Sequence, residues 1–185
     1  MSFDAKPRTR GVVPAPGQVF DRPCPLKVVL LGATGSIGRQ TVDVVRRNPD
    51  KVELVAVAAR TSADELAGLA REFPTIRHIA LADESLKATF AADTVPAGCE
   101  VTFGRAAVDA LASLPEADCV LNALVGFSGM RASYNALSCG HELALANKES
   151  LVVAGDLIMP LARPGKLLPV DSEHSAIFQC FLGND

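Results

Sequence analysis

Hydrophobic and polar positions follow two alternating patterns from residue 27 onward, and together they predict strands separated by helices. Short, nearly continuous apolar runs predict buried strands. These runs cover residues 27–31, 52–58, 78–81, 119–124, 142–146 and 166–170, with a further short one at 100–103. Between them, apolar residues return every three or four positions, which predicts helices over 36–47, 63–73, 83–92, 105–114, 128–139, 149–161 and 172–182.

The order of these elements favours one fold class. Strands that alternate with helices form parallel sheets with right-handed crossovers, so we expect an α/β doubly wound, Rossmann-like domain at residues 27–170. Its ligand should lie across the carboxyl ends of the strands. Residues 1–26 contain five prolines and are expected to form an extended arm. Residues 171–185 begin a helix without a closing strand, which predicts the start of a catalytic, metal-binding domain whose remainder is absent.

Composition narrows the function classes. The net charge of -3, without a basic run interleaved with aromatic residues, argues against nucleic acid as a partner. No apolar run reaches the roughly 20 residues that cross a bilayer, so no membrane partner is expected. The five cysteines are scattered and form no C-x-x-C pair, which argues against a disulfide framework or a zinc cluster and favours a reducing cytoplasm.

A glycine-rich turn joins the first predicted strand to the first helix. Gly32 permits a tight turn, Gly35 lets backbone N–H groups approach a pyrophosphate, and Gly38 lets helix and strand pack closely. Because the turn stands directly between a strand and a helix, it predicts a dinucleotide site. The alternative is a turn whose glycines serve geometry alone.

The end of the second strand indicates which dinucleotide is bound. An NAD site places an acidic residue there, whereas this chain has Arg60, Thr61 and Ser62. Arg60 can pair with a 2′-phosphate and the two hydroxyls can donate hydrogen bonds to it, so NADPH is the expected cofactor. The alternative is that Arg60 is a solvated surface charge.

Two further clusters of polar residues follow the later strands. Asn147, Lys148 and Glu149 come directly after 142–146, and Asp171 and Glu173 follow 166–170. Lys148 could hold a substrate oxygen, while the two carboxylates suit Mg²⁺ or Mn²⁺. Each cluster also has a structural interpretation, as a helix cap or a favourable charge in a first helical turn, and His174 beside the carboxylates is expected to be structural or to support a ligand.

Four segments together resemble the 1-deoxy-D-xylulose 5-phosphate reductoisomerase family. They are the glycine turn and residues 123–126 (Ala-Leu-Val-Gly), 145–151 (Leu-Ala-Asn-Lys-Glu-Ser-Leu) and 168–174 (Leu-Pro-Val-Asp-Ser-Glu-His), in matching order between about residues 27 and 178. The resemblance implies a metal-assisted rearrangement of the sugar phosphate to an aldehyde, followed by hydride transfer from NADPH. The product would be 2-C-methyl-D-erythritol 4-phosphate, in non-mevalonate isoprenoid synthesis.

The resemblance also implies roles for individual residues. The pyrophosphate would be held by Thr34, Gly35, Ser36 and Ile37. The nucleotide would also be contacted by Asn147 and Glu149, the substrate by Lys148, Ser172 and Glu173, and the metal by Asp171 and Glu173, with Lys148 and Glu173 taken as the catalytic pair. Residues 60–62 depart from the Gly-Lys-Asn frequent in the family, which leaves the contacts there open. Family members are about twice as long and commonly homodimeric, so a chain that ends at Asp185 should lack turnover.

Three other functions compete with this interpretation. A short-chain dehydrogenase needs a lysine four residues after its tyrosine, but Tyr134 is followed there by Ser138. A semialdehyde-type dehydrogenase needs an activated cysteine, and Cys139 has no evident activator. The third alternative is a sensor module that binds NADPH without catalysis. It predicts cofactor binding without any effect of metal or sugar phosphate.

Overall fold

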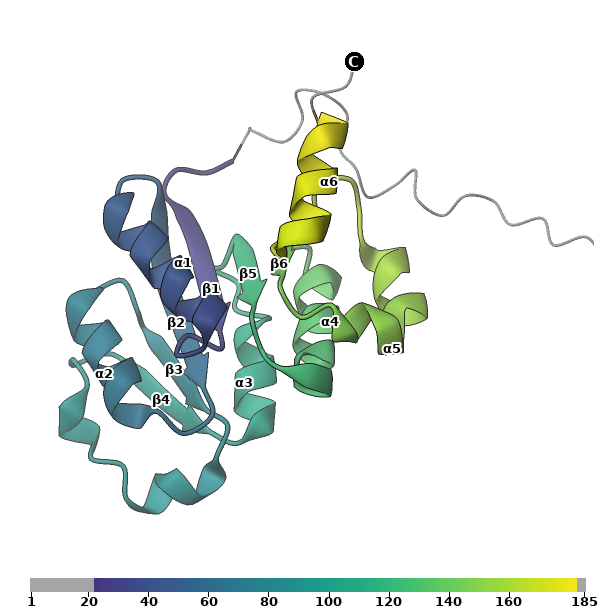
Figure 1. Cartoon of the computed structure of the whole chain (residues 1–185). Helices are drawn as coiled ribbons and strands as arrows, with labels where there is room; N and C mark the ends of the chain where they lie inside the picture. Colours follow the sequence, from purple (N-terminus) through teal and green to yellow (C-terminus); the bar gives the residue numbers. More distant parts are fainter. Residues whose placement is uncertain (1–21, 183–185) are drawn as a thin grey trace, which may run out of the picture.

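The computed structural model describes residues 22–182, and they form one seven-stranded sheet with helices on both faces (Figure 1). The strand order is β4-β3-β2-β1-β5-β6-β7, and every neighbouring pair is parallel. The strands are β1 (Leu26–Leu31), β2 (Val52–Ala59), β3 (His78–Leu81), β4 (Glu100–Phe103), β5 (Cys119–Asn122), β6 (Glu142–Leu145) and β7 (Leu167–Pro169). The α/β doubly wound fold is therefore confirmed.

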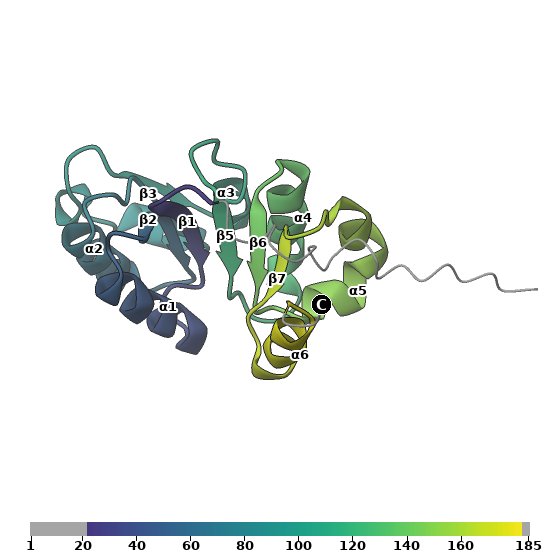
Figure 2. The same cartoon turned by 90° about the horizontal axis from the view of Figure 1, so that it is seen from above.

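Within the described part of the chain, six α-helices connect and cover these strands. They are α1 (Ser36–Arg47), α2 (Ala63–Glu72), α3 (Arg105–Leu111), α4 (Met130–Ser138), α5 (Glu149–Ile158) and α6 (Ser172–Leu182). Buried side chains of α1 and α2 pack on one face of the sheet, and those of α3, α4 and α5 pack on the other. In Figure 2 these two layers lie on opposite sides of the strands, with α6 on the α1 side.

The alternating strand residues supply both halves of the core. In β1, Val29 and Leu31 face the α3–α5 layer, whereas Val28 and Leu30 face the α1–α2 layer. Leu30 and Leu31 are both fully buried because helices cover the two faces of the strand. The small aliphatic side chains that dominate the composition thus form two thin apolar layers on either side of one sheet.

The predicted helix at 83–92 is wrong. The structure has two short 3₁₀ helices there, η1 (Glu84–Ala88) and η2 (Ala92–Thr94), and neither contains a buried residue. Asp83 accepts hydrogen bonds from the backbone N–H and the hydroxyl of Ser85, which stabilises a local turn in place of a regular helix. Leu86 and Phe90 pack only partly buried against the core, so the segment lacks the fully buried apolar stripe that stabilises a longer helix.

Helix ends differ at three other places. The predicted helix at 105–114 ends at Leu111. The predicted helix at 128–139 begins instead as a 3₁₀ turn, η3 (Gly126–Gly129), before α4. The predicted helix at 149–161 ends at Ile158, and its last residues form the 3₁₀ helix η4 (Met159–Leu161), which contains Pro160. The expected arm at 1–26 lies largely outside the described residues, and Leu26 already belongs to β1.

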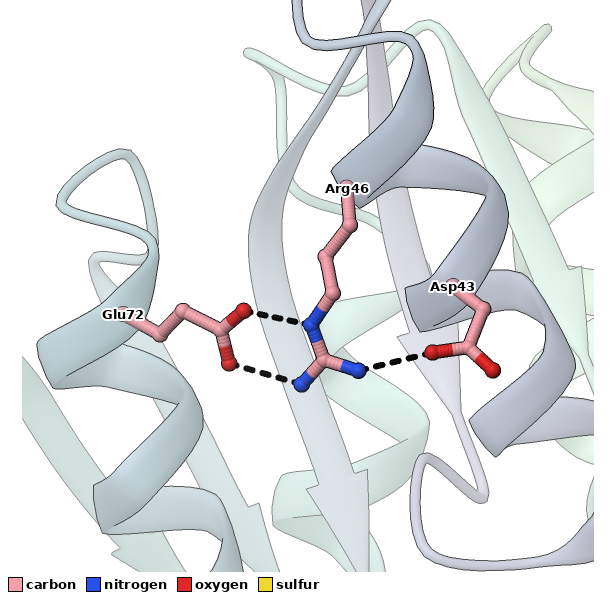
Figure 3. A network of polar contacts seen from close by, with 3 residues as sticks. All are labelled: Asp43, Arg46 and Glu72. Carbon is pink, nitrogen blue, oxygen red and sulfur yellow. Dashed lines mark hydrogen bonds and ion pairs between the residues drawn. The ribbon is translucent and has the colours of Figure 1, made fainter.

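An ion-pair network ties α1 to α2 at the surface (Figure 3). The guanidinium of Arg46 on α1 donates to both carboxylate oxygens of Glu72 on α2, at 2.5 and 2.7 Å, and to Asp43 at 2.7 Å. These carboxylates raise the pKa of Arg46 above its ordinary value. The bidentate geometry fixes the spacing of two helices that flank the glycine turn.

The sheet topology indicates a ligand site at the carboxyl edge of the sheet, between β1 and β5. The chain runs outward from β1 through β2 to β4 and then crosses back to β5 on the other side of β1. The loops after β1 and β5 therefore leave the sheet in opposite directions and open a crevice at its carboxyl edge. Within residues 22–182, none of the helices is long and apolar enough to span a membrane.

Candidate functional site

The glycine turn after β1 has the close backbone approaches that its spacing predicts. Gly32 has φ +84°, and its N–H and that of Ala33 both donate to Ala58 at the end of β2, at 2.9 Å. A Cβ on Gly38 would lie 2.2 Å from the carbonyl oxygen of Gly32, and a Cβ on Gly32 would lie 2.6 Å from that of Ala123. Glycine is therefore required for turn, helix and neighbouring loop to meet.

A pocket of about 870 Å³ opens beside this turn, and we call it the dinucleotide pocket. Its walls come from the carboxyl ends of β1, β2, β3 and β5 and from α3. Of the residues expected to bind the cofactor, Thr34, Gly35 and Arg60 line it. Ser36 is exposed at the start of α1, and Ile37 is half-buried behind the turn. The pocket thus unites the glycine turn with the guanidinium expected at a 2′-phosphate.

The other two residues expected near the 2′-phosphate lie differently. Thr61 and Ser62 line a neighbouring hollow of about 470 Å³ instead of the dinucleotide pocket. The hydroxyl of Ser62 donates to that of Thr34 at 3.4 Å, so Ser62 connects the loop after β2 with the glycine turn. Arg60 is accordingly the member of this trio that faces the dinucleotide pocket.

Charged residues from α3 and from the loop after β3 also line this pocket. Arg105, Asp83, Glu84 and Asp109 join Arg60 there. Hydrogen bonds from Ser85, with the positive charge of Arg60, hold the pKa of Asp83 below its ordinary value. Burial raises the pKa of Asp109, which is 8% exposed. The pocket therefore combines two cations with carboxylates of different basicity.

Asn147, expected to contact the nucleotide, is 2% exposed and fully hydrogen-bonded. Its Nδ2 donates to the carbonyl oxygens of Leu124 and Gly126. Its Oδ1 accepts from the backbone N–H and the hydroxyl of Ser150. The side chain thus connects the start of α5 to the loop that follows β5.

A second pocket, of about 490 Å³, lies between α5 and α6 at the ends of β6 and β7, and we call it the distal pocket. Lys148, Asp171 and His174 line it, together with apolar side chains that include Leu151 and Phe178. Nδ1 of His174 lies 2.7 Å from one carboxylate oxygen of Asp171. Hydrogen bonds from His174, first from its backbone N–H, lower the pKa of Asp171, so that carboxylate stays ionised.

The remaining predicted residues lie at helix starts near the distal pocket. Glu149 is the first residue of α5, Ser172 and Glu173 are the first two of α6, and all three are exposed. Among residues 22–182, no group of three or more His, Cys, Asp or Glu side chains could hold a metal ion. Asp171 and Glu173 therefore offer at most part of a coordination shell, of the oxygen type that Mg²⁺ and Mn²⁺ prefer.

Comparison with known proteins is consistent with this geometry. The family model for 1-deoxy-D-xylulose 5-phosphate reductoisomerase matches residues 28–155. The enzyme of that name from Mycobacterium leprae is 45% identical over 158 residues, which are 85% of this chain and 37% of that protein. The enzyme from Zymomonas mobilis, solved in complex with NADPH, is 40% identical with a TM-score of 0.77, covering 85% of this chain and 41% of that one.

The chain belongs to the 1-deoxy-D-xylulose 5-phosphate reductoisomerase family. It spans about two fifths of the length of the curated relatives that it matches. A further structure of the family was solved in complex with NADPH, fosmidomycin and magnesium. It is 34% identical to this chain with a TM-score of 0.76, and the match covers 84% of this chain and 38% of that one.

Sequence reasoning missed several residues that the fold brings to the dinucleotide pocket. Asp83 comes two residues after β3 and Arg105 two residues after β4, so both lie at strand ends beside Arg60. The same strand-end argument that selected Arg60 would have found them. None of residues 60–62 is acidic, but Asp83 brings a carboxylate to the same pocket. Asn122, fully buried in β5, had no such signal.

Proposed function

We propose that this chain is the NADPH-binding part of a 1-deoxy-D-xylulose 5-phosphate reductoisomerase, which converts that sugar phosphate to 2-C-methyl-D-erythritol 4-phosphate. The observation that carries the proposal is that this chain, which matches the family model, has a dinucleotide pocket with the glycine turn on one wall and Arg60 on another. Thr34, Gly35, Ser36 and Ile37 would hold the pyrophosphate through backbone N–H groups. Relatives crystallised with NADPH support the same cofactor here.

Arg60 would select NADPH over NADH. Its side chain is exposed in the pocket and has no hydrogen bond or ion pair within residues 22–182, so its donors are available to a 2′-phosphate. A guanidinium binds such a group through two parallel charge-assisted hydrogen bonds. Thr61 and Ser62 would support the loop that carries Arg60, and Glu149 would meet the nucleotide at its other end.

The distal pocket would receive the sugar phosphate. Lys148 would hold a substrate oxygen, Ser172 would donate to the substrate, and Glu173 would lie near a substrate hydroxyl. Asp171 and Glu173 would supply two of the oxygen ligands of Mg²⁺ or Mn²⁺, which when bound polarises the carbonyl that reacts. His174, which contacts the Asp171 carboxylate through Nδ1, would help to orient it for this role. A relative solved with fosmidomycin and magnesium supports a small-molecule ligand and a divalent metal.

The proposal extends to the organisation of the whole protein. Residues 27–170 would form the NADPH-binding domain, and residues from 171 onward would begin the catalytic, metal-binding part. The complete enzyme would be a cytoplasmic homodimer without nucleic-acid or membrane partners.

Calorimetric titration of the 185-residue chain with NADPH and NADH tests the cofactor proposal. We expect tighter binding of NADPH, and Arg60→Ala should cost about tenfold to a hundredfold in NADPH affinity with little effect on NADH, since charged hydrogen bonds contribute roughly 1.5–3 kcal/mol. Arg163→Ala is the matched control, because Arg163 is exposed in the turn before β7, at the opposite edge of the sheet. Equal affinity for both nucleotides, or binding of neither, would refute the proposal.

Catalysis is tested in a polypeptide of family length that carries this chain. Oxidation of NADPH in the presence of 1-deoxy-D-xylulose 5-phosphate and Mn²⁺ should be abolished by Lys148→Ala and by Glu173→Gln, while NADPH binding stays intact. Binding of NADPH without turnover in the unmodified protein would instead identify a sensor.

A further inference from the structure

The loop that connects β5 to α4, residues 123–129, forms one wall of the dinucleotide pocket, through Ala123, Leu124, Val125 and Ser128. Burial of apolar side chains anchors only its first part. Leu124 packs against the core, whereas Val125 is 89% exposed and Phe127 is 59% exposed, so neither of these two is held by the core. Beyond Leu124 the conformation of this wall must therefore be held by something other than burial of its large side chains.

Hydrogen bonds from two buried asparagines hold the loop from behind. Asn147 donates to the carbonyl oxygens of Leu124 and Gly126, the latter at 2.7 Å. Asn122 donates to that of Gly129 at 2.8 Å and accepts from the N–H of Leu124 at 3.2 Å. The asparagines thus bind the loop near its beginning, middle and end.

These side chains have no N–H donor left for a ligand. Both N–H groups of the Asn147 amide are used on the loop, and its oxygen accepts two hydrogen bonds from Ser150. The second N–H of Asn122 donates to the hydroxyl of Ser133 at 2.8 Å. At 2% and 0% exposure, neither amide reaches the pocket surface.

We propose that Asn122 and Asn147 are positioning residues, which together hold residues 123–129 in the conformation that binds the dinucleotide. The inference rests on the proposed function and deepens it, because it assigns the Asn147 side chain an effect on the nucleotide through the loop. We call this pair the asparagine clamp.

Gly129 shows how closely the clamp closes. A Cβ at this position would lie 2.8 Å from Nδ2 and 2.9 Å from Oδ1 of Asn122, and 3.1 Å from Cγ of Asn147. The two amides therefore converge on one backbone position, and only glycine leaves room for both. This convergence links the two asparagines mechanically, so that loss of either should release the same loop.

The clamp also couples the two pockets. Asn147 fixes the wall of the dinucleotide pocket, while the next residue, Lys148, lines the distal pocket. Hydrogen bonds from Ser150 fix Asn147 in turn at the first turn of α5. Asn147 therefore connects the loop at the dinucleotide pocket directly to the residue that lines the distal pocket.

Asn147→Asp in the 185-residue chain tests the clamp. Aspartate has the same shape and keeps the acceptor for Ser150, but it replaces the donor by an oxygen facing two carbonyl oxygens. We expect the Kd for NADPH to rise about tenfold, because the apparent Kd rises by the reciprocal of the fraction of molecules with the loop in place. The Kd for NADH should rise by the same factor, whereas Arg60→Ala should affect the binding of NADPH much more than that of NADH. Amides of residues 123–129 should also exchange hydrogen faster in the free protein.

Asn122→Asp separates positioning from direct contact, since Asn122 is fully buried behind the loop. It should reproduce the loss of affinity, and the double variant should lose little more than the worse single one. Asn48→Asp is the matched control: Asn48 donates to Val44 at the exposed end of α1, and both affinity and loop exchange should stay at wild-type values. If an aspartate variant fails to fold, Ser133→Ala and Ser150→Ala each remove one hydroxyl from the clamp and should produce smaller changes in the same direction.

Two results would overturn the inference. One is wild-type NADPH affinity in Asn147→Asp. The other is weaker binding in Asn147→Asp with unchanged loop exchange and a normal Asn122→Asp variant, which would mean that Asn147 touches the nucleotide itself. If the wild-type chain binds neither nucleotide, the proposed function fails, but hydrogen exchange in the free protein still decides whether the clamp holds the loop.

Discussion

Replacing Gly38 by alanine should damage both the stability and the cofactor site of this protein. The added methyl group would lie 2.2 Å from the carbonyl oxygen of Gly32 and 2.6 Å from the carbonyl carbon and oxygen of Ala33. All three are backbone atoms, so no side chain can rotate away. The turn between β1 and α1 must open, which moves the N–H groups proposed to bind the pyrophosphate.

The magnitude follows from two opposing effects. Overpacking costs roughly 1–3 kcal/mol, and a clash with rigid backbone belongs at the upper end. The better helix propensity of alanine returns about 1 kcal/mol. We therefore expect a net loss of about 2 kcal/mol in the free energy of unfolding, or roughly 4–8 °C in Tm for a domain of this size.

Urea unfolding followed by circular dichroism measures this loss, and calorimetry measures NADPH affinity in the same variant. Gly155→Ala is the matched control, since a Cβ at Gly155 on α5 meets no atom within 4 Å. It should leave NADPH binding unchanged and leave stability equal or raised by about 0.5–1 kcal/mol. If Gly38→Ala proves as stable as Gly155→Ala and binds NADPH normally, the close approach at the turn does not constrain the site.

Three further outcomes are expected from the structure. Arg46→Ala should lower the free energy of unfolding by less than about 1 kcal/mol, because the carboxylates that Arg46 pairs with are partly exposed. This loss of stability should become smaller in high salt, and a loss that does not depend on salt would exclude the ion pair as its cause. Burial raises the pKa of Asp109, so the folded state loses stability as the pH rises from the ordinary carboxyl range through that raised value. Asp109→Asn should remove this decrease of stability with pH and be more stable than the wild type at neutral pH. Urea unfolding at several pH values measures both effects. Burial raises the pKa of Cys119 to about 12, so mass spectrometry after iodoacetamide should find it unlabelled in the native protein, in contrast to the exposed thiols of Cys24, Cys139 and Cys180.

Local features of this protein could be predicted from its sequence. Hydrophobic periodicity located every strand, and the bounds of β3, β4 and α1 agree with the structure to the residue. The glycine turn was equally evident, because the requirement for glycine arises within a few residues of chain. At 83–92 the same method failed, since none of the apolar side chains of η1 and η2 is fully buried and the Asp83 turn replaces the helix.

The tertiary structure determines which side chains meet at the site and which groups they bind. Arg60, Asp83 and Arg105 are far apart in the chain and meet because β2, β3 and β4 are neighbours in the sheet. Asn147 has the chemistry of a ligand-binding residue, yet its hydrogen bonds are consumed by a loop more than twenty residues earlier. A sequence shows which groups a side chain could bind. Packing decides which of them it does bind, because it brings distant segments close together and buries their donors and acceptors side by side.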